Sequence, residues 1–125
     1  MTAPFSPQDA LIAAMILTAA ADAEMSEEES RVAGAVMSTL PAMRGFDERR
    51  FGEISAVVVE MLGEDDGIEQ CLTLIDEALP EHLRETAYAL ACDVSAADGE
   101  VALEEARLLE MLRHRLRIDR LNAAA

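Results

Sequence analysis

The residues of this sequence that could do chemistry are acidic, and they gather in two short stretches. One reads AADAEMSEEESR (20–31) and the other AADGEVALEEAR (96–107). Carboxylates held this close repel one another unless they are well solvated or share a cation. Oxygen ligands of this kind suit Ca²⁺ or Mg²⁺ best, with Zn²⁺ and Mn²⁺ less favoured. The candidate metal ligands are Asp22, Glu24 and Glu29 in the first stretch and Asp98, Glu100 and Glu105 in the second.

Helix capping explains part of the same pattern. Ser26 and Glu29 have the spacing of a capping box, in which the hydroxyl accepts from the Glu29 N–H and the carboxylate accepts from the Ser26 N–H. Acids in a first helical turn also face the positive end of the helix dipole. In the second stretch Ala102 replaces the capping serine, yet Glu104 and Glu105 remain. The acids that precede each helix have no required capping role, so both interpretations stay open.

A regular EF-hand is excluded by spacing. The run DGEVALEE resembles the back half of such a calcium loop, with Asp, Gly, a variable residue, an aliphatic residue and a glutamate at the twelfth position. The front half should supply oxygens four and two residues before Asp98, where Val94 and Ala96 stand. The first copy offers Thr18 and Ala20 at these places, which is hardly better. A looser acidic site remains compatible with the sequence.

The two acidic stretches are copies of one pattern. At an offset of 76 residues, seven of the twelve positions in 20–31 are identical in 96–107, and apolar positions continue to match beyond this window. Each copy follows an apolar run and precedes a second helical run. The sequence therefore predicts two helix–acidic turn–helix repeats, at 7–40 and 81–116.

The chain as a whole predicts an all-α fold of about seven helices, since no run alternates as a strand does. Ser6 and Pro7 are typical of a helix start, and GEDDG (63–67) is typical of an exposed turn between helices. The helices at the starts of the two repeats are apolar on most sides and are expected at the centre. The expected helices cover about 7–21, 26–40, 48–62, 68–78, 81–96 and 103–116, and a short seventh begins at Asp119.

The length of 125 residues fits one domain, 1–125, within which the larger repeats cover about 7–62 and 81–121. Hydrophobic residues make up 51 % of the chain and tryptophan is absent, so Leu, Val, Ile, Ala and Met must build the core. Cys71 and Cys92 are too few and too far apart for a zinc site or a disulfide framework. Both are expected as small buried hydrophobic residues.

A net charge of −15 limits the partners that this surface can bind. Phosphate backbones and anionic membranes would be repelled, so no nucleic-acid partner is expected. A cation or a basic protein partner fits, although acidity that only keeps the protein in solution explains the same charge. No basic region precedes the apolar run at 10–21, and that run is too short to span a bilayer. We therefore expect a cytoplasmic protein without direct membrane insertion.

The sequence offers no catalytic constellation, and a non-enzymatic protein is expected. His82 and His114 have no nucleophile near them in the sequence, and no phosphate-binding loop or nucleophile elbow occurs. Glu110 and His114 have the spacing of a surface pair on one helix. The basic run RHRLRIDR (113–120) is expected to complement a helix dipole, or to pair with acids of the other repeat or of a second subunit.

The two acidic copies resemble the TerB family of tellurite-resistance proteins. The likeness rests on AADGEVALEEARLLEMLRHRL (96–116) and on its echo AADAEMSEEESRVAGAVMSTL (20–40), each after an apolar helix, and it covers most of the chain. It implies a bundle of about seven helices with internal pseudo-symmetry. It also implies a bacterial cytoplasmic protein linked to stress or toxic-oxyanion resistance, with divalent cations bound by these acids and with partner proteins. Ala23 and Ala102 depart from the glycine and the serine of the family pattern.

Two functions remain in competition at this point. The first is a non-enzymatic TerB-like module that binds divalent cations at its two acidic turns and docks a partner protein, with a homodimer also compatible. The second is a metal-independent interaction scaffold, whose acids only cap helices and keep the protein soluble.

Overall fold

The computed structural model describes residues 5–20, 27–97 and 103–118, and this part of the chain is all α-helical, as the sequence predicts. The six expected helices are present, with ends within a residue or two of the predicted ones. The short 3₁₀ turn η1 was not expected, and the helix expected from Asp119 lies outside the described residues. The elements are α1 (Pro7–Ala20), α2 (Glu27–Thr39), η1 (Pro41–Met43), α3 (Arg49–Leu62), α4 (Gly67–Ala78), α5 (Glu81–Ser95) and α6 (Leu103–Arg115).

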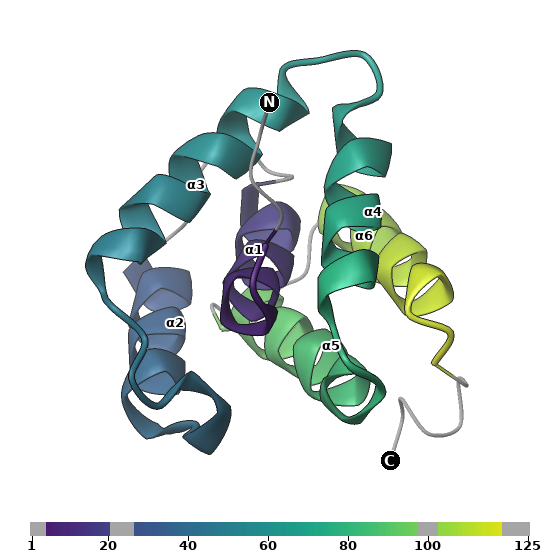
Figure 1. Cartoon of the computed structure of the whole chain (residues 1–125). Coiled ribbons are helices and arrows are strands. Elements are labelled where there is room, and N and C mark those ends of the chain that lie inside the picture. Colours follow the sequence, from purple (N-terminus) through teal and green to yellow (C-terminus); the bar gives the residue numbers. More distant parts are fainter. Residues whose placement is uncertain (1–4, 21–26, 98–102, 119–125) are drawn as a thin grey trace.

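Helix α1 lies at the centre of the fold (Figure 1). Each of the residues 10–17 is at most 4 % exposed, and α1 packs against every other α-helix. A helix with no polar face must be covered on all sides, which is why the other helices surround it. The buried Thr18 hydroxyl donates within the helix, to the carbonyl oxygens of Ala14 and Met15 at 3.2 and 3.1 Å. The expected central position of the first helix is confirmed.

Helix α5 makes the most extensive contact with α1, but it is covered on one side only. Its buried residues lie on one stripe: Ala87, Leu90, Ala91, Val94 and Ser95. Glu81, Glu85 and Asp93 are exposed on the opposite side. The expected packing of this helix against α1 is present. The apolar character expected on most of its sides is not, because charged side chains at helical spacing hold one face of α5 in water.

Helices α3, α4 and α6 each bury one apolar stripe. These stripes consist of Ile54, Val58 and Met61, of Cys71, Leu72 and Ile75, and of Leu108, Leu109 and Leu112. Burial raises the pKa of the Cys71 thiol to about 12, so this cysteine acts as an apolar side chain, as expected, while Cys92 is only partly buried. None of the described helices combines the length and the apolar character that a bilayer crossing requires.

A capping box with a buried ion pair fixes the start of α1. The Ser6 N–H donates to Asp9 Oδ2, and the Asp9 N–H donates to Ser6 Oγ, both at 3.1 Å. Arg50 of α3 donates to both carboxylate oxygens of Asp9, from Nε at 3.1 Å and from Nη2 at 2.6 Å. Asp9 is only 3 % exposed, so these bonds supply the pairing that a buried charge needs. They hold α3 against the first turn of the central helix.

The turn between α3 and α4 depends on Gly67. A Cβ atom at this position would lie 2.5 Å from the carbonyl carbon of Met61 and closer still to its carbonyl oxygen. The first residue of α4 therefore rests on the backbone of the last turn of α3, at a distance that a residue with a side chain cannot reach. This contact sets the spacing of the two helices at their joined ends.

Arginines near the end of α6 fasten this helix to α4. Arg115 donates to the Thr73 hydroxyl at 2.8 Å and forms an ion pair with Glu69. Arg117 Nη2 lies 3.8 Å from Asp76 Oδ1. Glu69 and Asp76 belong to α4, which lies between the two repeats. Arg115 and Arg117 therefore pair neither with the other repeat nor with a second subunit, as the sequence analysis had allowed, but with a helix that neither repeat includes.

We expect Gly67→Ala to lower the free energy of unfolding by about 3 kcal/mol, because the backbone of α3 or α4 must shift to admit the new methyl group. Gly52→Ala is the matched control. Gly52 lies inside α3, and a Cβ atom added there would have no atom within 4 Å apart from its chain neighbours and the nearby backbone of its own helix. Alanine should therefore stabilise the protein by about 0.5–1 kcal/mol. Urea unfolding followed by circular dichroism measures both changes. Equal effects of the two substitutions would contradict the close backbone contact.

The ion pair of Asp9 predicts a pH dependence of stability. Burial by itself would raise the pKa of Asp9, but the hydrogen bonds from Arg50 and Ser6 and the charge of Arg50 outweigh it and hold the pKa below its ordinary value of 3.8. The contribution of Asp9 to stability is therefore complete above that pH, and it is lost as the pH falls through the lowered value.

Asp9→Asn should accordingly lower the free energy of unfolding by about 1–2 kcal/mol at neutral pH. The difference from the parent protein should shrink below about pH 4 in urea titrations at a series of pH values. Asp93→Asn, at an exposed position of α5, serves as the control and should have little effect. A difference between parent and Asp9→Asn that stays constant down to about pH 2 would rule out the assigned role.

Candidate functional site

The helices on either side of the two acidic turns keep the 76-residue offset of the sequence repeat. Helices α2 and α6 have equal lengths, and α6 starts and ends 76 residues after α2. The helices before the two turns end at Ala20 and at Ser95, within one residue of the same offset. Each turn therefore connects a helix of the α1–α5 pair to the helix that follows it.

Among the six candidate ligands, the structure describes the side chain of Glu105. Asp22, Glu24, Asp98 and Glu100 lie outside the described residues. Glu29 belongs to α2, but its side chain is not described. In the part of the chain that is described, no three His, Cys, Asp or Glu side chains form a group that could hold a metal ion. The two ligand sets thus stay a prediction. The described residues nearest to them are those at the end of the helix before each turn and at the start of the helix after it.

Glu105 differs from the other described acids of the two turns. It lies in the first turn of α6 and is only 5 % exposed, whereas its neighbour Glu104 is exposed, as are Glu27 and Glu28 at the start of α2. The helix dipole favours a carboxylate at this place. Interaction with the dipole does not require burial, so Glu105 fits a ligand better than its neighbours do.

Ser95 is a second buried polar residue at the same turn, and sequence reasoning missed it. It is the last residue of α5, it is fully buried, and its hydroxyl has no hydrogen-bond partner among the described residues. The equivalent position of the first repeat is Ala19. The sequence could have pointed to Ser95, because it places a hydroxyl at the end of an apolar run, just before the acids. The second acidic turn is thus preceded and followed by buried oxygen-bearing side chains.

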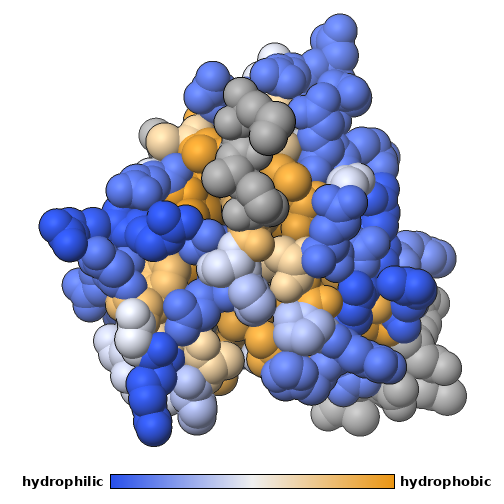
Figure 2. Space-filling view, viewed as in Figure 1, coloured by the Kyte–Doolittle hydropathy of each residue, from blue (hydrophilic) through white to orange (hydrophobic). Residues whose placement is uncertain are grey.

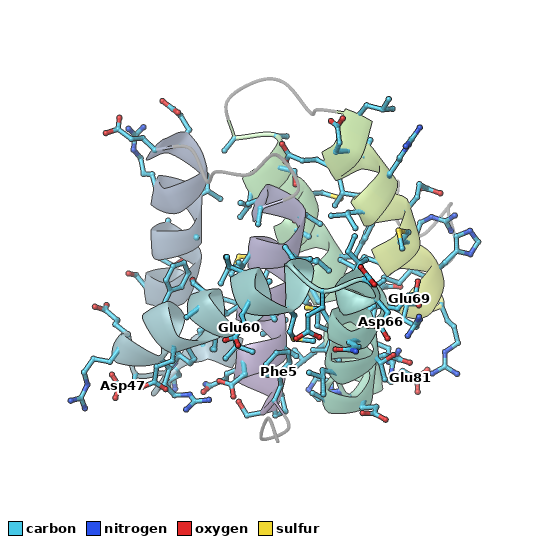
Figure 3. All side chains as sticks on the ribbon, turned by 90° about the horizontal axis from the view of Figure 1, so that it is seen from above. Phe5, Asp47, Glu60, Asp66, Glu69 and Glu81 are labelled. Atoms are coloured by element: carbon cyan, nitrogen blue, oxygen red, sulfur yellow. The ribbon has the colours of Figure 1, made fainter. Side chains whose placement is uncertain are left out.

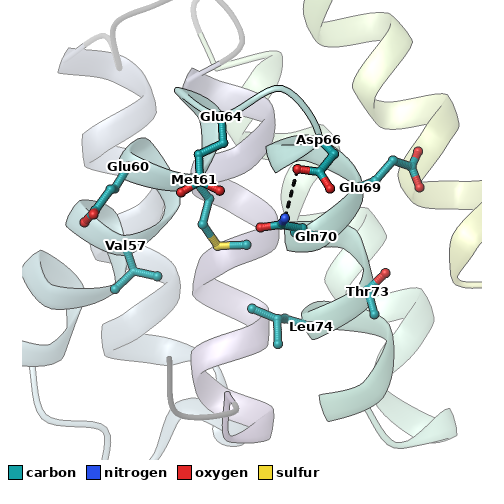
Figure 4. A pocket seen from close by; sticks show the side chains of 9 residues that line it. All are labelled: Val57, Glu60, Met61, Glu64, Asp66, Glu69, Gln70, Thr73 and Leu74. Atoms are coloured by element: carbon teal, nitrogen blue, oxygen red, sulfur yellow. Dashed lines mark hydrogen bonds between the residues drawn. The ribbon is translucent and has the colours of Figure 1, made fainter. Parts of the chain in front are cut away.

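Acidic side chains also border a hollow of about 590 Å³ between α3 and α4, which we call the α3–α4 groove. Figure 3 shows Glu60 on the α3 side, and Asp66 and Glu69 on the α4 side. The GEDDG turn that joins the helices is exposed from Gly63 to Asp66, as expected of a solvated turn. The groove is lined by Val57, Glu60, Met61, Glu64, Asp66, Glu69, Gln70, Thr73 and Leu74 (Figure 4).

The histidines occupy surface positions. His82 is exposed on α5 and His114 is exposed on α6. Glu110, expected as the surface neighbour of His114, forms an ion pair with Arg113 at 3.0 Å. These placements assign no chemical task to either imidazole.

The structure defines a class of protein: an all-helical bundle around one buried helix, whose sequence carries the helix–acidic turn–helix unit twice. The chain belongs to the TerB family, since the sequence profile described as "Tellurite resistance protein TerB" matches residues 8–125. The resemblance stated from the two acidic copies is thereby confirmed. No match was found among curated proteins or among solved structures.

Proposed function

We propose that this TerB-family chain is a non-enzymatic helical module that binds a divalent cation, Ca²⁺ or Mg²⁺, at each acidic turn and docks a protein partner. The single observation that carries the cation proposal is the burial of Glu105, next to an exposed glutamate of the same type. A carboxylate that only interacts with the helix dipole can stay in water, whereas a ligand must face the ion.

The role of each residue follows from its place along the chain. Glu105 belongs to the first turn of α6, and Asp98 and Glu100 precede that helix by a few residues. A bound cation would neutralise the repulsion among these carboxylates and stabilise the start of α6 relative to the end of α5. In the first repeat Asp22, Glu24 and Glu29 would do the same for α1 and α2. The proposed output is a fixed geometry of each helix pair, on which the partner docks.

The proposal places the protein in the cytoplasm and in a response to toxic oxyanions or related stress. The free thiols of Cys71 and Cys92 suit a reducing compartment. The description of the family supports the link to tellurite resistance. A homodimer stays compatible with this function.

The alternative is a scaffold that binds its partner without metal. The start of α1 favours it, because Ser6 and Asp9 form a capping box in which an acid three residues after a serine accepts a backbone hydrogen bond at the helix start. Ser26 and Glu29 have the same spacing. In that case the acids of both turns cap helices and keep the protein in solution.

Thermal melting separates the two functions. We expect millimolar Ca²⁺ or Mg²⁺ to raise the Tm relative to EDTA, because a ligand that binds the folded state stabilises it by about 1.4 kcal/mol at ten times its dissociation constant. Glu105→Gln, and separately the double variant Asp98→Asn with Glu100→Gln, should each reduce this shift. Glu104→Gln is the matched control and should keep it. Mn²⁺ and Zn²⁺ are included as less favoured ions.

The absence of a shift with all four cations would leave the metal-independent scaffold. If Glu104→Gln and Glu105→Gln reduced the cation-induced Tm shift equally, the shift would come from the general negative charge of the surface rather than from Glu105 as a ligand. Each variant is compared with its own EDTA melt, so a change in its basal stability does not enter the result.

A further inference from the structure

The α3–α4 groove has an apolar floor. Met61 of α3 and Leu74 of α4 point into the space between the two helices, and Val57 of α3 also lines it (Figure 4). In the space-filling view, hydrophobic residues are visible between the hydrophilic surfaces of α3 and α4, where α1 also lies (Figures 1 and 2). Val57 and Leu74 are each partly exposed. An apolar strip in a hollow is the kind of surface that receives the apolar side chains of a partner.

The rim of the groove carries negative charge that the chain does not neutralise. Glu60, Glu64 and Asp66 are exposed, and within the described residues none of them forms an ion pair. Glu69 is different, because it faces α6 and pairs with Arg115. The chain has 25 acidic residues and 10 arginines, so neutralisation of this rim requires charge from outside the molecule.

The groove is preformed. The contact between Gly67 and the Met61 carbonyl fixes the joined ends of α3 and α4. Asp66 accepts a hydrogen bond from Gln70 Nε2 at 2.9 Å, and Arg115 holds the outer side of α4 against α6. Little ordering of this surface is therefore needed when a partner binds, which favours binding.

We propose that the α3–α4 groove docks a basic amphipathic helix of a partner protein, with apolar residues against Val57, Met61 and Leu74 and with Lys or Arg beside Glu60, Glu64 and Asp66. The proposal rests on the docking role stated above and does not require a bound cation. The stretch 67–74 of α4, which forms one wall of the groove, spans about 10 Å, or two helical turns. A partner helix of two or three turns matches this length.

Other occupants fit less well. The groove walls are helices whose backbone groups are already hydrogen-bonded, so they offer no edge to which an extended peptide could add a strand. Nucleic acid and anionic membranes are repelled by the acidic rim. A second copy of this chain would bring a net charge of −15, and Arg113 and Arg115 are already engaged within their own molecule.

The test uses the full chain and a fluorescein-labelled synthetic peptide of leucine and lysine, about three helical turns long, with the leucines on one face. A scrambled peptide of the same composition spreads its leucines around the helix. Fluorescence anisotropy in EDTA should give saturable binding of the first peptide and at least about tenfold weaker binding of the second.

The rim variant is the triple substitution Glu60→Gln, Glu64→Gln and Asp66→Asn, and it should weaken binding by about tenfold or more. The matched control replaces three exposed acids that do not line the groove, Glu48→Gln, Glu85→Gln and Asp93→Asn, and should change the affinity by less than about threefold. Both variants remove three negative charges. Leu74→Asn should weaken binding without changing its dependence on salt, and a circular dichroism melt verifies that each variant folds.

Equal binding of the scrambled peptide, or an equal loss in the rim and control variants, would show attraction by net charge alone and overturn the proposal. So would a chain that sediments as a dimer which the peptide dissociates, because a second copy would then occupy the groove. Failure of the peptide to bind in both EDTA and Ca²⁺ also overturns it. That result leaves the Tm shifts of the Glu104 and Glu105 variants, and hence the cation proposal, unaffected.

Discussion

The complete burial of α1 is the constraint on which the rest of this structure depends. A helix with apolar residues on all sides is stable in water only when every side is covered, and here each of the other α-helices contributes to the cover. Those helices must turn their apolar stripes inward, and their charged residues consequently face outward. The strongly acidic surface is thus the outer side of the same arrangement that hides α1.

Three of the arginines join one helix to another. Arg50 connects α3 to the capped start of α1, Arg84 forms an ion pair with Asp76 between α5 and α4 at 2.6 Å, and Arg115 connects α6 to α4. The carboxylates that form no ion pair within the described residues include Glu60, Glu64 and Asp66 along the α3–α4 groove, and further acids stand in the two acidic stretches of the sequence. Both proposed activities, cation binding and docking of a basic helix, use this remaining negative charge.

Much of the fold could be predicted from the sequence, because helical spacing and capping signals are local. The order of the six helices, the burial of α1 and the family followed from such signals. The exposed face of α5 was also readable, since Glu81, Glu85 and Asp93 recur at helical spacing, but the apolar residues between them were given too much weight. The bond of Asp9 to Arg50 joins residues 41 positions apart, and no local pattern reveals such a partner.

The candidate sites were less predictable, because they depend on packing. Glu104 and Glu105 are adjacent and chemically identical, and only the position of α6 decides which of them is buried. Of the α3–α4 groove, the sequence predicted only the exposed GEDDG turn at 63–67. Its floor combines Val57 and Leu74 from two helices, and these residues come together because Gly67 lets the backbones touch.

The central position of α1 has a consequence for synthesis of the chain. The helix that most needs cover is translated first, while α5, its largest neighbour, and α6 follow near the other end of the sequence. A nascent chain therefore holds an uncovered apolar segment until the late helices leave the ribosome, and such surfaces attract chaperones or aggregate. The order of the helices makes the emergence of α5 and α6, rather than formation of the first helix, the event that commits this fold to its native state.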